Sequence, residues 1–126
     1  MRIRVLTILF LFGATAASSA ADARTDAKKQ VQFGITVAQR GLWREAIYRW
    51  ERAVQIDPTY AEALNDLAIA YEHEGDLEKA RVAYEKALEI DPNNAAIKQN
   101  YELFKEINDR TTRKDSQDSG DNQDSQ

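Results

Sequence analysis

Acidic side chains around the single histidine are the group of residues in this chain most able to do chemistry. Within one short stretch the sequence places Glu72, His73, Glu74, Asp76 and Glu78. Carboxylates and an imidazole together could bind a metal ion or transfer protons. However, their spacing does not match a calcium-binding loop, and zinc normally takes three or four protein donors. We interpret the cluster as a solvated acidic turn and expect no metal or other cofactor.

The central part of the chain lacks the side chains that nucleophilic catalysis needs. Between Ala27 and Arg110 there is no serine and no cysteine, and the aliphatic hydroxyls are those of Thr36 and Thr59. A serine or cysteine triad is therefore excluded there. The sequence also contains no glycine-rich phosphate-binding loop, and no spacing places two carboxylates around a pocket. These observations predict that the protein is not an enzyme.

The acidic turn belongs to a block, 61–94, whose landmarks recur at one constant interval in the preceding block, 27–60. The pairs at this interval are Gly41 and Gly75, Ala46 and Ala80, Ala53 and Ala87, and the Asp-Pro steps at 57–58 and 91–92. Apolar residues follow helical spacing on both sides of each glycine. A period of about 34 residues is typical of helical repeat arrays. Each of the two blocks is predicted to form a helical hairpin.

Residues near the ends of these helices support the boundaries. Pro58 and Pro92 end the second helix of each hairpin, because proline disfavours helical geometry in the residue before it. Asp76 is expected to cap the helix that follows it. Thr59 and Glu62 have the spacing of a capping box for the first helix of the second hairpin.

Residues 95–110 begin like a third repeat but lack a second helix. Ile97, Tyr101 and Phe104 form an apolar stripe that can pack on the second hairpin. The positions that would face a partner helix are charged, namely Lys98, Glu102 and Lys105. We expect a capping helix with a solvated outer face. Residues 111–126 contain no apolar side chain, which predicts a disordered acidic tail.

Residues 1–21 have the pattern of a secretory signal peptide. Arg2 and Arg4 precede an apolar run that gives way to small residues before Ala21. The run is shorter than the roughly 20 residues that a membrane-spanning helix needs. Cleavage after the alanine at 20, 21 or 23 fits this pattern, and residues 22–26 would then form a short linker. We expect a periplasmic or secreted protein; an uncleaved membrane anchor is the alternative, and membrane contact is expected only then.

Charge is divided unevenly between the two hairpins. Residues 27–60 carry six Lys or Arg against three Asp or Glu, a net charge of +3, whereas residues 61–94 carry three against nine, a net charge of −6. Removing the two arginines of residues 1–21 changes the formal net charge from −4 to −6. This balance excludes nucleic acid as a suitable partner. With no cysteine in the chain, helix packing must stabilise the domain without disulfides.

Residues 61–94 resemble the tetratricopeptide repeat (TPR) family nearly position for position. The family's signature places hold Leu64, Leu67, Ala68, Tyr71, Gly75, Ala80, Tyr84, Ala87 and Pro92. The resemblance implies an all-α fold, a short right-handed solenoid of two hairpins and a C-terminal capping helix. It also implies a protein–protein interaction module.

In this family the first helices of successive repeats line a concave groove. The resemblance assigns to that groove Val31, Ile35, Ala38, Asn65, Ile69, His73, Gln99 and Leu103. Among them Ile35, Ile69 and Leu103 recur at the repeat interval and would form an apolar ladder suited to a helix or an extended peptide. Packing between neighbouring first helices is the alternative role for these side chains.

Recognition of a C-terminal carboxylate is not expected. The family's chaperone-binding members use Lys, Asn and Arg at places that here hold Val31, Ile35, Asp66, Ala96 and Asn100. We therefore predict an adaptor of the periplasm or cell envelope that holds a peptide or helix of another protein. The alternative is a self-assembling structural oligomer, in which basic residues 27–60 contact acidic residues 61–94 of another copy, head to tail.

Overall fold

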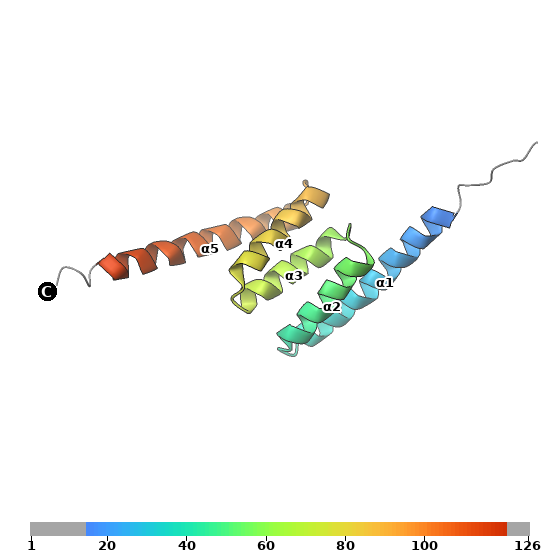
Figure 1. The fold of residues 1–126 in the computed structure, drawn as a ribbon, viewed down its shortest axis with the longest axis horizontal. Coiled ribbons are helices and arrows are strands. Elements are labelled where there is room, and N and C mark those ends of the chain that lie inside the picture. Colours follow the sequence, from blue (N-terminus) through green and yellow to red (C-terminus); the bar gives the residue numbers. More distant parts are fainter. Residues whose placement is uncertain (1–14, 121–126) are drawn as a thin grey trace, which may run out of the picture.

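Five helices make up the regular structure of residues 15–120, the part of the chain that the computed structural model describes (Figure 1). They are α1 (Thr15–Ala38), α2 (Trp43–Ile56), α3 (Ala61–His73), α4 (Leu77–Ile90) and α5 (Ala95–Gly120). α1 pairs with α2 and α3 with α4, α2 packs on α3, and α5 packs on α4 and α3. The predicted all-α solenoid of two hairpins and a further helix is confirmed.

Small residues allow the two helices of each hairpin to approach closely. Four fully buried alanines lie in the second helices: Ala46, Ala53, Ala80 and Ala87. Trp50 and Tyr84 fill the space beside them and are only 4% and 1% exposed. The Trp50 ring also lies against Gly34 of α1, and its Nε1–H donates to the carbonyl of Val31 at 3.2 Å. The indole is thus held both by packing and by a buried hydrogen bond.

Glycine reverses the chain within each hairpin. Gly41 and Gly75 have φ values of 77° and 79°, in the left-handed region that side chains rarely adopt. After the second turn Asp76 caps α4, and its carboxylate accepts from the backbone N–H of Lys79 at 3.4 Å. The predicted N-cap is therefore confirmed.

Asp57 organises the turn between the hairpins. Its carboxylate accepts from Arg24, from the Thr59 backbone N–H at 3.0 Å and from the Thr59 hydroxyl at 2.7 Å. Burial alone would raise the pKa of Asp57, but these hydrogen bonds outweigh it and hold the pKa below the usual 3.8. Because Thr59 is engaged by Asp57, the capping box predicted with Glu62 does not form. Tyr60 precedes α3 instead and makes no side-chain capping bond.

The N-terminal part of α1 replaces the predicted linker. Residues 22–26 are helical, and the first part of the expected signal peptide, residues 1–14, lies outside the described residues. Arg24 explains why this segment packs on the body, because its guanidinium also bonds to the Thr59 carbonyl at 3.2 Å and lies 4.5 Å from the Tyr60 ring centroid. None of the helices in residues 15–120 is long and apolar enough to cross a membrane.

α5 covers the end of the second hairpin, as predicted. Ile97 and Phe104 are 1% and 4% exposed, and the ring centroid of Phe104 lies 5.6 Å from that of Tyr84. Lys98 and Glu102 are exposed, as expected for the charged side of the helix. Lys105 differs from that expectation, because it is half-buried with its Nζ 4.7 Å from the Tyr101 ring centroid.

Beyond residue 110 the structure differs from the predicted disordered tail. α5 continues to Gly120, and only residues 121–126 lie outside the description. The hydroxyls of Thr111 and Thr112 donate to the carbonyls of Ile107 and Asn108, both at 3.0 Å. These bonds follow the helix, and no proline interrupts residues 95–120. Helical geometry is thus propagated through a segment that buries no apolar surface of its own.

Replacing Gly34 should destabilise the first hairpin. A Cβ at Gly34 would lie 2.5 Å from Trp50 Nε1 and 2.9 Å from its Cδ1, so Gly34→Ala forces the helices apart or displaces the indole. We expect the free energy of unfolding to fall by about 1–3 kcal/mol, measured by urea denaturation. Gln32→Ala, at an exposed position of the same helix, is the control and should change it by less than about 0.5 kcal/mol. Equal stability of the two variants would contradict the close approach.

Candidate functional site

An open surface pocket of about 320 Å³, which we call the α1–α3 pocket, lies between the first helices of the two hairpins. It is lined by Ile35 and Ala38 of α1, Gln39 just after α1, Trp43 and Trp50 of α2, and Asp66 and Ile69 of α3. Apolar and aromatic side chains provide most of this lining, and Asp66 is the charged residue among those described. The volume lies in the range of protein sites that bind small molecules or side chains.

Three of the residues predicted to line a groove meet in this pocket. Ile35 and Ala38 are half-buried, and Ile69 is 37% exposed. Val31 is instead part of the core at 7% exposure, because its helix turn packs under Trp50. Its assignment to an open groove is therefore corrected.

The remaining predicted groove residues lie outside the pocket lining. Asn65 accepts a hydrogen bond from Asn100 at 3.0 Å and so joins α3 to α5. Gln99 is exposed on α5, and Leu103 is 55% exposed there. The predicted ladder of Ile35, Ile69 and Leu103 is thus divided: the first two meet in one pocket, and the third does not line it.

His73 contributes to the site through an aromatic contact. Its imidazole stacks on the indole of Trp43, with ring centroids 4.0 Å apart and an interplanar angle of 21°. Its Nδ1 lies 3.8 Å from a carboxylate oxygen of Glu74. Trp43 belongs to the lining of the α1–α3 pocket, so His73 contacts a lining residue without lining the pocket itself. Trp43 was not among the residues that the sequence indicated.

The groove prediction also omitted the lining residues Asp66, Gln39 and Trp50. Burial is the main cause that raises the pKa of Asp66 to about 6, while a hydrogen bond with Asn65 opposes the shift and nearby Glu62 adds to it. Among the described residues, no lysine, arginine or histidine lies within ion-pair distance of its carboxylate. The carboxyl group is therefore desolvated without a cationic partner in the chain itself.

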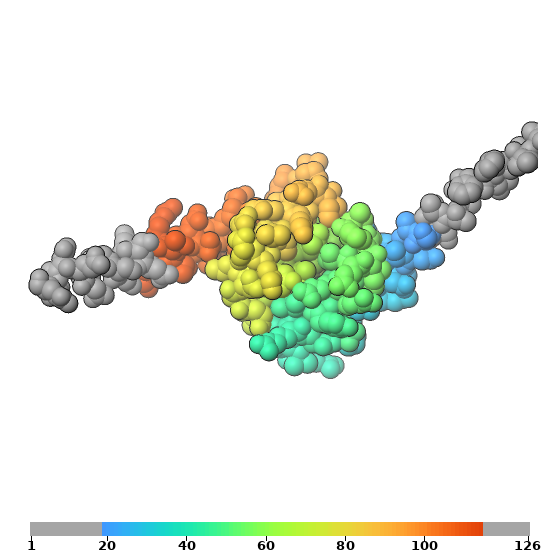
Figure 2. All heavy atoms as spheres, viewed as in Figure 1, coloured from blue at the N-terminus to red at the C-terminus, as the bar shows by residue number. Residues whose placement is uncertain are grey.

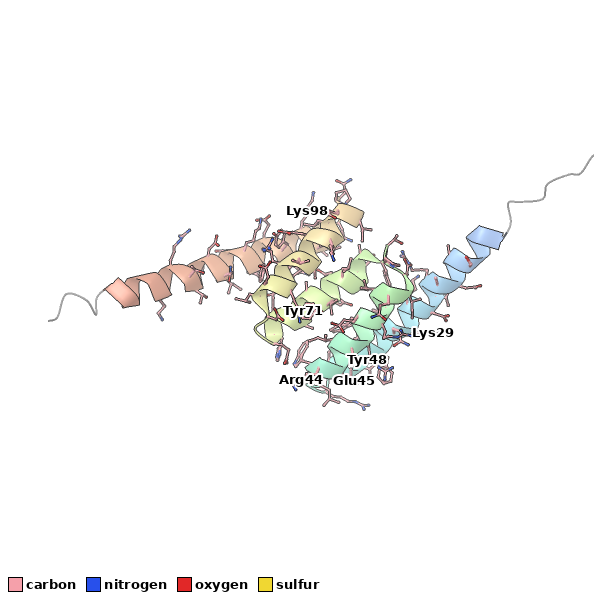
Figure 3. The ribbon with its side chains drawn as sticks, viewed as in Figure 1. Lys29, Arg44, Glu45, Tyr48, Tyr71 and Lys98 are labelled. Carbon is pink, nitrogen blue, oxygen red and sulfur yellow. The ribbon has the colours of Figure 1, made fainter. Side chains whose placement is uncertain are left out.

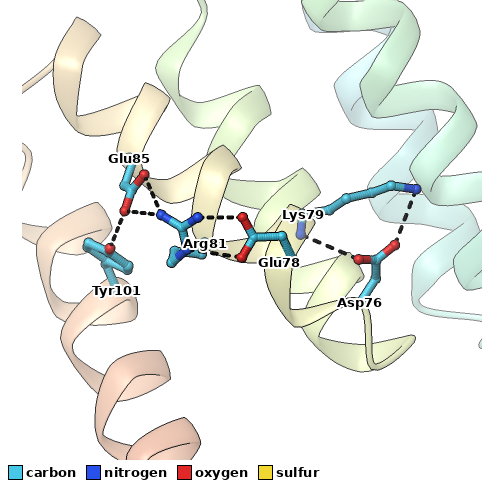
Figure 4. Close-up of polar contacts among 6 residues, drawn as sticks. All are labelled: Asp76, Glu78, Lys79, Arg81, Glu85 and Tyr101. Carbon is cyan, nitrogen blue, oxygen red and sulfur yellow. Dashed lines mark hydrogen bonds and ion pairs between the residues drawn. The ribbon is translucent and has the colours of Figure 1, made fainter.

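The acidic turn at residues 72–78 differs from the α1–α3 pocket in that its carboxylates bond to neighbouring side chains. On α4, Arg81 bonds to Glu78 and to Glu85, and Glu85 also accepts from the Tyr101 hydroxyl at 2.9 Å (Figure 4). Asp76 pairs with Lys79 at 3.2 Å (Figure 4). Within the described part of the chain, no group of three or more potential ligands could hold a metal ion. These carboxylates are engaged by neighbouring side chains.

Tyr71 fixes one hairpin against the other. It lies at the junction of α3 with α2 (Figure 3), and its hydroxyl donates to Glu51 at 2.7 Å. Burial, followed by this bond to a carboxylate, raises the pKa of Tyr71 above its usual value of 10. This bond joins α2 to α3 outside the α1–α3 pocket.

A second hollow, of about 260 Å³, lies on the side of the molecule formed by the second helices. Figure 2 views the molecule largely onto α2 and α4. Val54 of α2, Leu64 of α3 and Val82 of α4 line this hollow, together with Lys79 and Lys86. Val82 is 36% exposed, nearly the same as Ile69 in the α1–α3 pocket.

Comparison with known proteins identifies the architecture. Residues 61–94 match the tetratricopeptide repeat family, and residues 37–75 match the family described as TPR repeat. The type IV pilus assembly protein PilF of Pseudomonas aeruginosa is 35% identical over 74 residues, which cover 59% of this chain and 29% of that protein. The chloroplastic tetratricopeptide repeat domain-containing protein PYG7 of Arabidopsis thaliana is 32% identical over 82 residues, with coverages of 60% and 27%. Residues 37–94 are therefore tetratricopeptide repeats.

Solved structures agree with this assignment. The crystal structure of MamA protein matches with a TM-score of 0.60 at 28% identity, over 68% of this chain and 46% of that one. The TPR-containing domain of a Plasmodium falciparum FK506-binding protein matches with a TM-score of 0.64 at 21% identity, which shows the fold alone. The chain spans less than a third of the length of the two curated relatives, 29% and 27%.

Neutralising Asp66 should stabilise the fold at neutral pH. A carboxyl group with a raised pKa binds more protons in the folded than in the unfolded chain, so stability falls as pH rises from about 4 to about 6. Asp66→Asn replaces the carboxyl group with a neutral amide and so removes this loss of stability. We expect a gain of about 1–2 kcal/mol in the free energy of unfolding at pH 7.5, after allowance for the group's partial exposure, and a smaller gain at pH 4.5.

Urea denaturation at both pH values measures this effect. Asp109→Asn is the matched control, because Asp109 is exposed on α5 and the substitution removes the same charge. It should change the free energy of unfolding by less than about 0.5 kcal/mol at either pH. A destabilised Asp66→Asn protein at pH 7.5 would contradict the assignment of Asp66 as an unpaired, desolvated carboxyl group.

Proposed function

We propose that this protein is a non-enzymatic adaptor that holds a segment of another protein in the α1–α3 pocket. The observation that carries the proposal is the pocket itself, in which Trp43, Ile35 and Ile69 present apolar surface to a partner. The tetratricopeptide repeats of residues 37–94 support it, because members of this family generally bind other proteins. An apolar site between helices suits a helix or an extended peptide.

We further propose that the adaptor works outside the cytoplasm. Arg2, Arg4 and the apolar run that follows them support export. Similarity to a protein named for type IV pilus assembly is consistent with a role in the cell envelope. Cleavage after residue 20 or 21 would retain Arg24, which anchors α1 to the turn at Asp57.

Self-assembly is a second candidate function, favoured by surfaces at opposite ends of the array (Figure 1). At one end the guanidinium of Arg49 lies 4.2 Å from the Phe33 ring centroid and 5.4 Å from that of Tyr48, and both rings are about half exposed. At the other end α5 exposes Leu103 and Ile107, and the adjoining hairpin, residues 61–94, carries a net charge of −6. A basic, aromatic surface would fit head to tail on an apolar one beside an acidic hairpin.

Light scattering at low and high salt tests self-assembly. If opposite charges join the ends, the molar mass should exceed that of a monomer at low salt and fall as salt screens the contact. Arg49→Glu should reduce the mass at low salt, whereas Arg40→Glu, at an exposed position without a described ring contact, should not. A monomer under both conditions would exclude this candidate function.

Selection of peptides on the full chain tests binding in the α1–α3 pocket. A phage-displayed library of short random peptides serves as the probe, and fluorescence anisotropy then gives the Kd of each enriched peptide. Ile69→Asp places a charge in the pocket and should weaken binding by tenfold or more, about 1.4 kcal/mol. Val82→Asp makes the same change at a similarly exposed residue on the other surface.

The two variants separate a site from a general effect on the fold. Binding by Val82→Asp should stay within about twofold of wild type, since a residue outside the interface contributes little. Circular dichroism must show equal helix content in all three proteins. Equal loss of binding in both variants, or undiminished binding by Ile69→Asp, contradicts the proposed pocket.

A further inference from the structure

Asp66 stands out in the α1–α3 pocket because it is charged, half-buried and without a cationic partner among the described residues. The other described lining residues are apolar, aromatic or, in Gln39, a neutral amide. The more deeply buried Asp57 pairs with Arg24, whereas Asp66 has a hydrogen bond with Asn65 and no cation. A desolvated charge without an opposite charge beside it is costly to a folded protein. A partner supplied from outside the chain would offset that cost.

The surroundings of Asp66 favour a cation as that partner. Glu62 lies close enough to add negative potential at the carboxylate, and residues 61–94 as a whole carry a net charge of −6. The indole of Trp43 lines the same pocket, and tryptophan faces attract ammonium and guanidinium groups. The apolar lining contributed by Ile35 and Ile69 suits the methylene stem of a long basic side chain.

We propose, on the basis of the function proposed above, that the bound segment presents a lysine or arginine flanked by apolar residues, and that Asp66 pairs with this cation. The flanking residues occupy the surface of Ile35, Ile69 and Trp43. Asp66 thereby selects among apolar segments, because a segment without a cation covers the half-buried carboxylate and leaves it without an opposite charge. An acidic side chain at the same point is rejected by charge repulsion.

Binding of such a segment should weaken as the carboxyl group becomes protonated. Besides Asp66, the titratable groups that bear on it are Glu62 on α3, Tyr84 on α4 and Tyr60 before α3, and His73 stacks on the lining residue Trp43. α1 and α2 contribute no charged residue to the described lining. With the pKa of Asp66 at about 6, about one tenth of the group is ionised at pH 5, so Kd should rise about tenfold between pH 7.5 and pH 5.

Parallel peptide selections on wild type and Asp66→Asn test the selection of a cation. The full chain and the same random library are used at pH 7.5. Wild type should enrich peptides with Lys or Arg between apolar residues. Asp66→Asn, which we expect to be the more stable protein, should still enrich apolar peptides but without the basic residue. Individual Lys or Arg peptides should bind this variant about tenfold more weakly than wild type.

The outcomes distinguish this inference from the proposed function. If wild type enriches apolar peptides that contain no Lys or Arg, the role of Asp66 is overturned. Equal enrichment of basic residues by wild type and Asp66→Asn overturns it as well. Both results leave the pocket as a binding site. If neither protein enriches peptides beyond the Ile69→Asp variant, the proposed function fails and this inference fails with it. Enrichment of Asp or Glu by wild type also overturns the inference.

Anisotropy titrations between pH 5 and pH 7.5 test the pH dependence. The probe is an enriched Lys or Arg peptide that has an amidated C-terminus and contains no histidine or carboxylate. Wild type and His73→Gln should both lose about tenfold in affinity at pH 5, and Asp66→Asn should bind equally at both values. If the affinity of His73→Gln does not depend on pH, the pH dependence of wild type comes from the His73 imidazole, and the role of Asp66 is overturned.

Discussion

The close approach of the two helices in each hairpin is the constraint on which this structure depends. Buried alanines such as Ala46 and Ala80 keep the helices near one another, and Gly34 admits the Trp50 indole against the backbone of α1. A hydrogen bond from this indole to the Val31 carbonyl fixes the ring inside the first hairpin. In the second hairpin Tyr84 has a different set of contacts: its hydroxyl donates to Glu72 of α3, and its ring centroid lies 5.6 Å from that of Phe104 on α5. Without these small residues the hairpins could not pack closely enough for α3 to face α1 across one pocket.

Within this frame most charged groups stabilise local structure, and Asp66 does not. Asp57 joins α1 to the turn between the hairpins, and Arg81 connects successive turns of α4 through Glu78 and Glu85. Glu78, one of the carboxylates of the acidic turn, is engaged in this way. Asp66 instead lies in the α1–α3 pocket with a pKa raised by burial. A protein retains such a group at a cost in stability where binding needs it, which is how functional sites commonly differ from the rest of a fold.

Periodicity and turn chemistry were sufficient to predict the helices but not all their ends. The repeat interval, the glycines at positive φ and the Asp76 cap depend on residues near one another in the chain, and all appear in the structure. The predictions that were wrong concern either contacts between residues far apart in the chain or the length of α5. Thr59 bonds to Asp57 in place of forming a cap, Arg24 secures residues that were expected to be a linker, and α5 continues beyond residue 110. A local pattern does not report these competing partners.

The sequence by itself therefore determined the family, the order of the helices and the apolar side of each one, because helical spacing and close packing are properties of neighbouring residues. It also indicated Ile35 and Ile69 as facing one groove. Only the tertiary structure decided that Val31 is buried beneath Trp50, that Trp43 stacks on His73, and that Asp66 shares the pocket without a cation. These properties depend on how α3 is placed against α1 and α2. That placement is set by side chains far apart in the chain, such as Tyr71 and Glu51.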